Sequence, residues 1–225
     1  MKLNRLQTCK RIIPVRSMVA ALLFIIGTVC FAETPAIEVL TLPDLSQWKT
    51  ETFSGETAYE VISIDNQPAI KASAEQSASG LVRKMKIDLT RTPYMNWSWK
   101  VDNVLENVDE TQKSGDDYAA RIYVVISGGM FFWRTRAISY AWASQQTKDS
   151  TWPNAFTDRA VMVAVESGPE FNGQWVTEKR NILEDIKILL GIDKTSIDAV
   201  AIMTDTDNSK QSATAYYGNI YFTAQ

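Results

Sequence analysis

Residues 201–209 read AIMTDTDNS, a short segment that begins like a buried strand and ends with side chains that could do chemistry. Its last residues include Asp205, Asp207 and Asn208, which offer several oxygen atoms close together. Such oxygens could coordinate calcium, although the glycine and the distant glutamate of an EF-hand loop are missing. They could also hydrogen-bond a sugar, pair through a carboxylate with Arg121, or form an Asx-turn that needs no ligand. The residue types alone leave all of these interpretations open.

A second group of polar residues lies in residues 114–125, which read SGDDYAARIYVV. On a regular strand Asp117 and Arg121 would share a face and could form a charge-assisted pair. That pair could be a structural salt bridge, or the floor of a site in which Arg121 donates to a sugar hydroxyl or to the carboxylate of an anionic sugar. If Asp116, Asp117, Asp205 and Asp207 converge without a cation, their repulsion would raise some of their pKa values. We therefore expect either Arg121 or a cation among them.

Aromatic rings are the other ingredient of a sugar-binding surface, because they pack against the apolar faces of sugar rings. The sequence contains seven tryptophans. We expect Trp97 and Trp99 in the core, since both fall on the apolar face of one alternating segment. Trp142 and Trp152 border the polar stretch SQQTKDSTWPNAF, so we expect them at a rim, with Trp142 beside the polar cluster. Trp133 fits either place, and the alternative for all of them is a wide core between two sheets.

The residue types that the chain lacks exclude several kinds of active site. It contains no histidine, which excludes Ser-His-Asp triads and zinc sites built on imidazole. A bound metal would have to be a hard cation held by oxygen atoms, and calcium at Asp205 and Asp207 is the candidate. Carboxylates, tyrosines and lysines could still serve a glycoside hydrolase or a polysaccharide lyase, but no spacing in the sequence marks either one.

We expect residues 1–32 to be a secretory signal peptide rather than part of the fold. Five basic residues without any acid precede the apolar run Met18–Val29, which is too short to cross a bilayer. Cleavage after Ala32 fits the small residues that a signal peptidase reads. A lipid anchor at Cys30 would need a small residue before it, and a valine stands there.

Removal of this leader would change the charge of the chain. Residues 33–225 contain 18 Lys and Arg against 26 Asp and Glu, a net charge of −8, and they contain no cysteine. Such acidity argues against nucleic acid and anionic membrane surfaces as partners. No second long apolar run follows, so we expect a periplasmic or secreted protein without a transmembrane segment.

The rest of the chain reads mainly as short strands separated by polar turns. Residues 94–101, YMNWSWKV, alternate apolar and polar side chains with the period of two that marks a half-buried strand. One amphipathic helix is predicted near residues 181–190, with Asn181 as its N-cap and Gly191 after its end. This pattern favours a mostly-β fold, an antiparallel β-sandwich of the jelly-roll kind, in one domain of residues 33–225.

Several of these segments together resemble the bacterial secreted family called domain of unknown function 3047. The resemblance covers about residues 40–224. It implies a galactose-binding-like jelly roll, a sandwich often used as a carbohydrate-binding or interaction module, and it implies no activity because a fold does not determine a function. The segments that carry it are AIKASAEQSASG at 69–80, YMNWSWKV at 94–101, SGDDYAARIYVV at 114–125, AIMTDTDNS at 201–209 and AYYGNIYF at 215–222.

These observations lead us to expect an exported binding module whose partner is a poly- or oligosaccharide. Two alternatives stay open, namely a module that binds an envelope protein through exposed aromatic residues, and a carboxylate-dependent glycoside hydrolase or polysaccharide lyase. We expect no cofactor, with calcium at Asp205 and Asp207 as the one exception that the residues leave open. The expected ligand-binding residues are Asp117, Arg121, Trp142, Asp205, Asp207 and Asn208.

Overall fold

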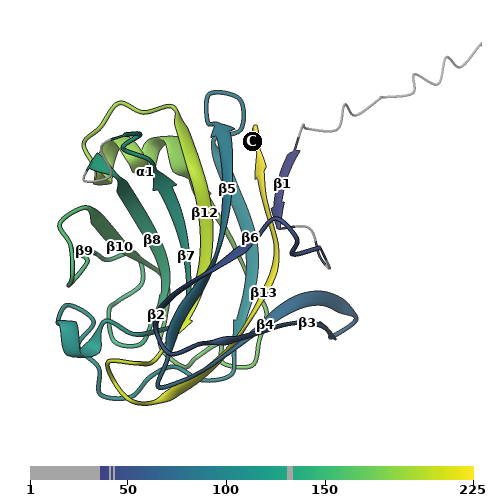
Figure 1. The fold of residues 1–225 in the computed structure, drawn as a ribbon, viewed down its shortest axis with the longest axis vertical. Coiled ribbons are helices and arrows are strands. Elements are labelled where there is room, and N and C mark those ends of the chain that lie inside the picture. Colours follow the sequence, from purple (N-terminus) through teal and green to yellow (C-terminus); the bar gives the residue numbers. More distant parts are fainter. Residues whose placement is uncertain (1–35, 41, 43, 131–133) are drawn as a thin grey trace, which may run out of the picture. The chain divides into compact units, whose positions relative to one another are not determined.

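Two β-sheets and one α-helix make up most of the part of the chain that the structure, a computed structural model, describes (Figure 1). The described residues are 36–40, 42, 44–130 and 134–225. The expected leader and Trp133 therefore lie outside them. Residues 34–225 form one compact unit.

The larger sheet contains seven strands: β2 (Lys49–Ser54), β5 (Ala78–Asp88), β7 (Tyr118–Ile126), β8 (Arg136–Ala143), β9 (Thr151–Pro153), β10 (Ala160–Ser167) and β12 (Ser196–Asp205). Their order across the sheet is β2-β5-β12-β7-β8-β10-β9. Neighbouring strands are antiparallel except for β8 and β10, which run parallel. β12 and β7 therefore lie near the middle of the sheet, hydrogen-bonded on both sides.

The smaller sheet contains six strands: β1 (Ala36–Leu40), β3 (Ala58–Ile64), β4 (Gln67–Glu75), β6 (Tyr94–Val101), β11 (Val176–Asn181) and β13 (Ser212–Thr223). Their order is β11-β6-β13-β4-β3, and β1 pairs with the last residues of β13. All of these pairs are antiparallel. The architecture confirms the predicted β-sandwich.

Large aromatic side chains fill the core between the two sheets. Trp97 and Trp99 of β6 are 1% and 0% exposed, which confirms their predicted place. Their ring centres lie 5.5 Å apart in an edge-to-face arrangement, and Trp97 also lies 5.7 Å from Tyr140 of β8. The ring centre of Trp99 lies 5.9 Å from that of Trp142, which also belongs to β8. Alternation along β6 and β8 turns these rings inward, because successive side chains of a strand point to opposite faces.

The predicted helix is confirmed as α1 (Ile182–Leu189). The side-chain oxygen of Asn181 accepts a hydrogen bond from the backbone N–H of Glu184 at 3.2 Å, as an N-cap does. Gly191 follows the helix with a φ of +63°, a conformation that costs glycine little. Among the described residues, no helix has both the length and the apolar character needed to cross a membrane.

A bulge between β7 and β12 decides which side chains reach the face of the larger sheet that points away from the smaller one. Met203 pairs with Arg121, whereas Asp205 pairs with Tyr118, so β7 contains one extra residue between the two pairs. The bulge brings two side chains of β7 together on this outer face. The guanidinium carbon of Arg121 lies 4.8 Å from the centre of the Tyr118 ring.

Candidate functional site

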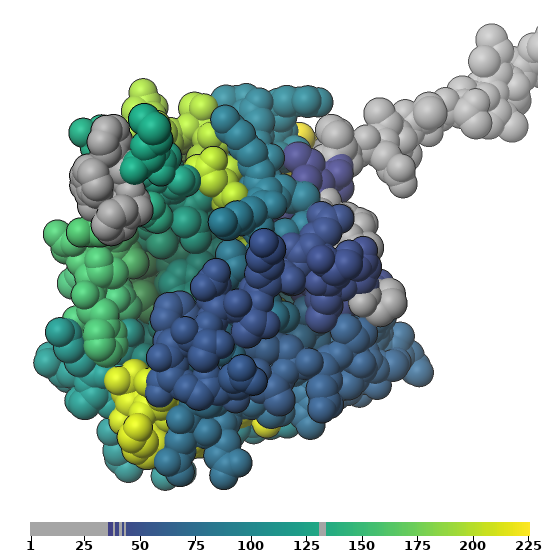
Figure 2. All heavy atoms as spheres, in the orientation of Figure 1, coloured from purple at the N-terminus to yellow at the C-terminus, as the bar shows by residue number. Residues whose placement is uncertain are grey.

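A pocket of about 380 Å³ lies on the outer face of the larger sheet, over β7 and β12, and we call it the outer-face pocket. In Figure 2 the surface is hollowed between the dark blue spheres around β2 and the green spheres of the chain near β9 and β10, with teal spheres at the base. Ile122 and Ile202 belong to the core, so the adjacent Arg121 and Met203 point outward into the pocket. Its polar lining residues are Asp116, Arg121, Asn154, Asp205, Asp207 and Asn208.

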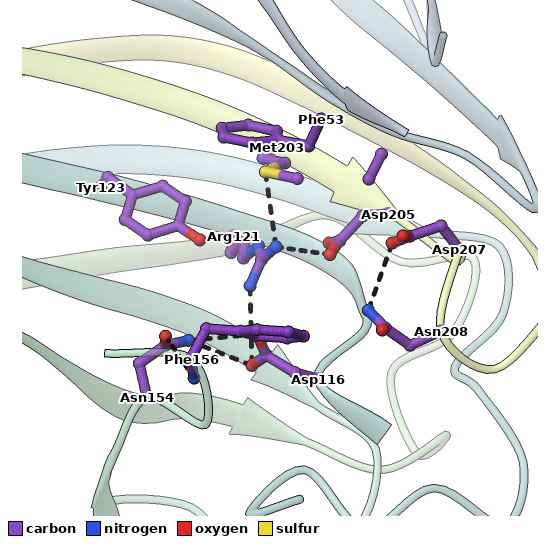
Figure 3. A pocket seen from close by; sticks show the side chains of 11 residues that line it. Phe53, Asp116, Arg121, Tyr123, Asn154, Phe156, Met203, Asp205, Asp207 and Asn208 are labelled. Atoms are coloured by element: carbon purple, nitrogen blue, oxygen red, sulfur yellow. Dashed lines mark hydrogen bonds and ion pairs between the residues drawn. The ribbon is translucent and has the colours of Figure 1, made fainter. Parts of the chain in front are cut away.

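Arg121 lies on the floor of the outer-face pocket and is only 4% exposed (Figure 3). Its Nη2 donates to the carboxylate of Asp205, and its Nη1 lies 4.0 Å from Oδ1 of Asp116. Its guanidinium carbon also lies 4.8 Å and 5.3 Å from the ring centres of Tyr118 and Tyr123, within the range of cation–π attraction. Two carboxylates and two rings therefore hold the guanidinium in one orientation.

Some polar atoms of this floor have no hydrogen-bond partner among the described residues. They are Nε and Nη1 of Arg121 and Oδ1 of Asp205, although the side chains are only 5% and 2% exposed. Buried polar atoms of native proteins are nearly always hydrogen-bonded, and leaving one unsatisfied costs about 1–3 kcal/mol. Because Arg121 and Asp205 both line the pocket, water or a polar ligand that enters it is the available partner for these atoms.

Two exposed phenylalanines form the apolar walls of the outer-face pocket. Phe53 of β2 is 71% exposed, and Phe156, in the turn after β9, is 56% exposed. Asn154 holds this turn in place. Its Nδ2 donates to both carboxylate oxygens of Asp116 at 3.1 and 3.2 Å. Its Oδ1 accepts a hydrogen bond from the backbone N–H of Phe156 at 3.1 Å. In Figure 3 the two rings lie on opposite sides of Arg121.

Asp117 lies beside the outer-face pocket rather than in its lining, and it anchors the turn that follows β12. It is fully buried, and its oxygens accept hydrogen bonds from the backbone N–H groups of Asn208 and Ser209 at 3.2 and 2.5 Å. The side-chain Nδ2 of Asn208 adds a third bond at 3.1 Å. Asp117 thereby positions Asp207 and Asn208 at the edge of the pocket. The segment AIMTDTDNS ends in acids because Asp205 pairs with arginine and the following residues form this turn.

Burial shifts the pKa values of the charged floor. It raises the pKa of Asp116 above its usual range, and Arg121 opposes this rise. It raises the pKa of Asp205 well above its usual value, against the effect of Arg121, and the carboxylates of Asp117, Asp116 and Asp207 add to the rise. Burial by itself would lower the pKa of Arg121, but Asp205 and other neighbours raise it above its usual value. Burial thus makes the ionised forms of both carboxyl groups costly, and Arg121 offsets part of that cost.

Calcium at Asp205 and Asp207 stays a prediction. Asp117, Asp205 and Asp207 each offer one carboxylate oxygen, and these oxygens lie within 4.8 Å of one another. Calcium takes about six to eight oxygen ligands, so these residues would supply only part of its shell. Arg121 already donates to Asp205, and it is the positive partner that we expected among these acids. The amide groups of the turn already donate to Asp117.

The expected pairing of Asp117 with Arg121 is wrong. We expected both on one face of a regular strand, but β7 begins at Tyr118 and carries a bulge before Arg121. Asp117 therefore turns toward the loop after β12, and Arg121 pairs with Asp205 and Asp116 instead. Among the predicted ligand-binding residues, the pocket is lined by Arg121, Asp205, Asp207 and Asn208.

The prediction that Trp142 accompanies the polar cluster is also wrong. Its side chain is 0% exposed between the sheets, and its Nε1 donates to the carbonyl oxygen of Gly168 at 3.1 Å. Trp152, which we expected at a rim, is 7% exposed and donates to the carbonyl oxygen of Glu110 at 3.2 Å. Neither ring can stack on a ligand in the outer-face pocket, because both are packed inside the protein.

The sequence interpretation missed Phe53, Asn154 and Phe156 as pocket residues. A signal for Asn154 and Phe156 exists in the polar stretch SQQTKDSTWPNAF, where an Asn-Ala-Phe sequence after a proline suits an exposed turn. Phe53 alternates with charged and polar residues on an edge strand, and no local pattern marks it as part of a site. Its position beside the pocket follows from the pairing of β2 with β5.

The solved structures that align with this chain include proteins whose names describe carbohydrate binding. A family 30 carbohydrate-binding module of a cellulosomal cellulase of Clostridium thermocellum aligns with a TM-score of 0.51 and 9% identity, over 85% of this chain and 98% of that chain. The lectin from Bauhinia forficata in complex with GalNAc aligns with a TM-score of 0.39 and 9% identity, over 85% of this chain and 100% of that chain. The first likeness shows the fold alone, and it confirms the predicted jelly-roll sandwich.

No curated protein matches the chain. A family model, in contrast, matches residues 46–221, which is most of the sequence. The matched range includes both strands of the pocket floor, β7 and β12, and the turn that carries Phe156. The chain therefore belongs to the family described as "Protein of unknown function (DUF3047)".

Proposed function

We propose that this protein is a carbohydrate-binding module that holds its ligand in the outer-face pocket. The observation that carries the proposal is the combination of two exposed aromatic walls, Phe53 and Phe156, with a floor of buried hydrogen-bonding atoms that lack partners in the described part of the chain. The apolar face of a sugar ring can pack against such walls, while its hydroxyl groups reach the floor. Because residues 1–32 read as a secretory signal peptide, we also propose that the protein acts outside the cytoplasm.

The floor matches the hydrogen-bonding capacity of sugar hydroxyls. A hydroxyl group both donates and accepts, so it can accept from a free N–H of Arg121 and donate to the free oxygen of Asp205. Asn208 and Asp207, which are both partly exposed at the edge of the pocket, offer further polar atoms. The volume of about 380 Å³ lies within the range of small-ligand pockets, roughly 300–1,000 Å³. A polar ligand with one apolar face fits this arrangement.

The family 30 module supports the proposal at the level of the fold. It is named as a carbohydrate-binding module, and the same kind of sandwich underlies the outer-face pocket. At 9% identity this support concerns the architecture and not the binding residues. The proposal for this chain therefore rests on its own pocket.

Affinity electrophoresis of the purified protein tests the proposal. Gels contain hydroxyethyl cellulose, galactan, glycol chitosan or polygalacturonate, and each is run once with calcium and once with a chelator. We expect at least one polysaccharide to retard the protein. We also expect Phe53→Ala and Phe156→Ala to weaken that binding by about tenfold each, since exposed aromatic residues dominate such contacts.

Phe171→Ala is the matched control, because Phe171 is 36% exposed and does not line the pocket. It should leave retardation unchanged. The proposal fails if none of the polysaccharides retards the protein, or if the double variant of Phe53 and Phe156 is retarded as strongly as the parent. Binding that needs calcium would support the calcium prediction at Asp205 and Asp207, and binding that survives the chelator would argue against it.

A further inference from the structure

The outer-face pocket holds more negative than positive charge. Asp116, Asp205 and Asp207 line it with carboxylates, and Arg121 is the one cation among the described residues of its lining. Asp117 adds a carboxylate directly beside it, within 4.8 Å of oxygens from Asp205 and Asp207. Charge that is shielded from water acts more strongly on a ligand than charge on an open surface. An incoming cation is therefore favoured in this pocket, and an incoming anion is disfavoured.

Arg121 does not reverse this preference for a cation, because its positive charge already interacts with two carboxylates. Its Nη2 donates to Asp205, and its Nη1 lies 4.0 Å from Asp116. A uronic acid that approached Arg121 would also approach both of these carboxylates and would meet their repulsion. The N–H groups of Arg121 that lack a hydrogen-bond partner among the described residues, on Nε and Nη1, are therefore suited to neutral hydroxyl oxygens.

The Oδ1 atom of Asp205 is an independent indication of a cationic ligand. It has no hydrogen-bond partner within the described ranges, although the residue is only 1% exposed. A buried carboxylate oxygen without a donor is unfavourable, and an ammonium group supplies both donors and a positive charge. Burial raises the pKa of Asp205 well above its usual value, and the neighbouring carboxylates add to this rise despite Arg121. A positive charge bound beside Asp205 would oppose this rise, as Arg121 does.

The Phe156 ring in the wall of the pocket also favours a cationic ligand. The face of an aromatic ring attracts ammonium groups. The ammonium of Lys113 already lies 5.4 Å from the centre of the Phe156 ring. Lys113 is exposed and does not belong to the lining of the pocket, so a bound ligand amine can compete with it for this ring.

We propose that the sugar held in the outer-face pocket is an amino sugar with a free, positively charged amine. This inference rests on the proposed carbohydrate-binding function and deepens it by naming the class of ligand. It replaces the anionic sugar that the sequence left open as a partner of Arg121, because the acids around the guanidinium would repel a second carboxylate.

Titration calorimetry with matched oligosaccharides tests the inference, at low salt and with a chelator present. The probes are oligosaccharides of glucosamine and of galactosamine, their N-acetylated counterparts of equal length, and an oligosaccharide of galacturonic acid. We expect at least one free-amine oligosaccharide to bind about tenfold or more tightly than its N-acetylated counterpart, and this preference to shrink as salt is added. The galacturonic acid oligosaccharide should not bind measurably.

Charge-neutral variants locate the preference in the pocket. Asp207→Asn removes one carboxylate from a partly exposed position without breaking a salt bridge, and it should reduce the amine preference by at least about threefold. Asp193→Asn removes the same charge from an exposed residue outside the lining and should leave the preference unchanged. Lys113→Gln should strengthen amine binding, because it removes a competing cation from the Phe156 ring. Circular dichroism confirms that each variant is folded.

The outcomes separate the two proposals. Equal or tighter binding of the N-acetylated or galacturonic acid probes would overturn the amino-sugar inference and leave the carbohydrate-binding function standing. No binding of any probe, together with retardation by hydroxyethyl cellulose or galactan in the gels, would overturn the amino-sugar inference alone. No binding in either experiment would overturn both proposals. An amine preference that Asp207→Asn does not change would place the cation elsewhere and overturn its assignment to this pocket.

Discussion

Two Arg–Asp pairs of this protein differ in burial and in how completely they are hydrogen-bonded. Arg180 and Asp185 lie beside the start of α1, where Nε and Nη2 donate to the two carboxylate oxygens at 3.0 and 2.7 Å. The hydroxyl group of Tyr140 donates to the same carboxylate at 2.7 Å. The side chains of Arg121 and Asp205 are buried more deeply: they are 5% and 2% exposed, whereas those of Arg180 and Asp185 are 28% and 10% exposed. Even so, Asp205 keeps one oxygen without a hydrogen-bond partner in the described chain.

The difference separates a pair that completes the fold from a pair that can serve a ligand. Both oxygens of Asp185 accept hydrogen bonds, so this pair has little left to offer a binding partner. The pair on the floor of the outer-face pocket is more costly to bury and less completely bonded, which is unusual in a native protein unless a further molecule contributes.

The largest effect is expected from Arg121→Ala. It would leave the buried carboxylate of Asp205 without its positive partner, so we expect the free energy of unfolding to fall by about 3–5 kcal/mol. Urea denaturation followed by tryptophan fluorescence measures this change. A loss near zero would show that Arg121 is solvated and not essential to the floor.

Replacing both members of the buried pair should recover much of this loss. We expect the free energy of unfolding of the double variant Arg121→Met with Asp205→Val to lie within about 1 kcal/mol of the parent value, or above it. The reason is that this variant removes two buried charges together. It should still fail to bind the ligand, since the hydrogen-bonding floor is gone. If the double variant is as unstable as Arg121→Ala, the instability comes from lost packing and not from an uncompensated charge.

Arg180→Ala should have a smaller effect than Arg121→Ala. Asp185 would keep the hydrogen bond from Tyr140 and some contact with water, so we expect a loss of about 1–2 kcal/mol in the free energy of unfolding. Ligand binding should not change. The same denaturation and binding measurements check both statements, and a reduced affinity would contradict the division between the two pairs.

The smallest effect is expected at Glu178, another carboxylate with an oxygen that lacks a hydrogen-bond partner among the described residues. Burial raises its pKa to about 7, against the effect of Lys148. The folded protein therefore holds a proton that the unfolded chain has released, and the free energy of unfolding should fall as the pH rises from about 4.5 to about 7. Glu178→Gln should flatten this part of the stability profile, measured by urea denaturation across the window. An unchanged slope would assign the pH dependence to other groups.

Local sequence patterns were sufficient to predict the sandwich, the core tryptophans and the helix. Alternation in residues 94–101 placed Trp97 and Trp99 between the sheets, because successive side chains of a strand point to opposite faces. The helix follows from an apolar stripe with Asn181 at its start and Gly191 after its end. Each of these features depends on neighbours only a few positions away, which a sequence displays directly.

Local patterns offered Arg121 as a partner for the acidic cluster, but they could not select the acid with which it pairs. Arg121 and Asp205 are 84 positions apart, and their contact depends on the register of β7 against β12 and on the bulge between them. A regular strand would have given Arg121 a different acid as its partner. A shift of one residue moves a side chain to the other face of a sheet, so a bulge that no local pattern displays changes the composition of the site.

The residue types available for binding could thus be read from the chain, whereas the packing of the sheets selected among them. Tryptophans bordering a polar stretch looked suited to a sugar, but the register of β8 turns Trp142 into the core. Strand pairing and a fixed turn instead place Phe53 and Phe156 at the pocket. Chemical character is a property of each residue, and exposure is a property of every segment packed around it.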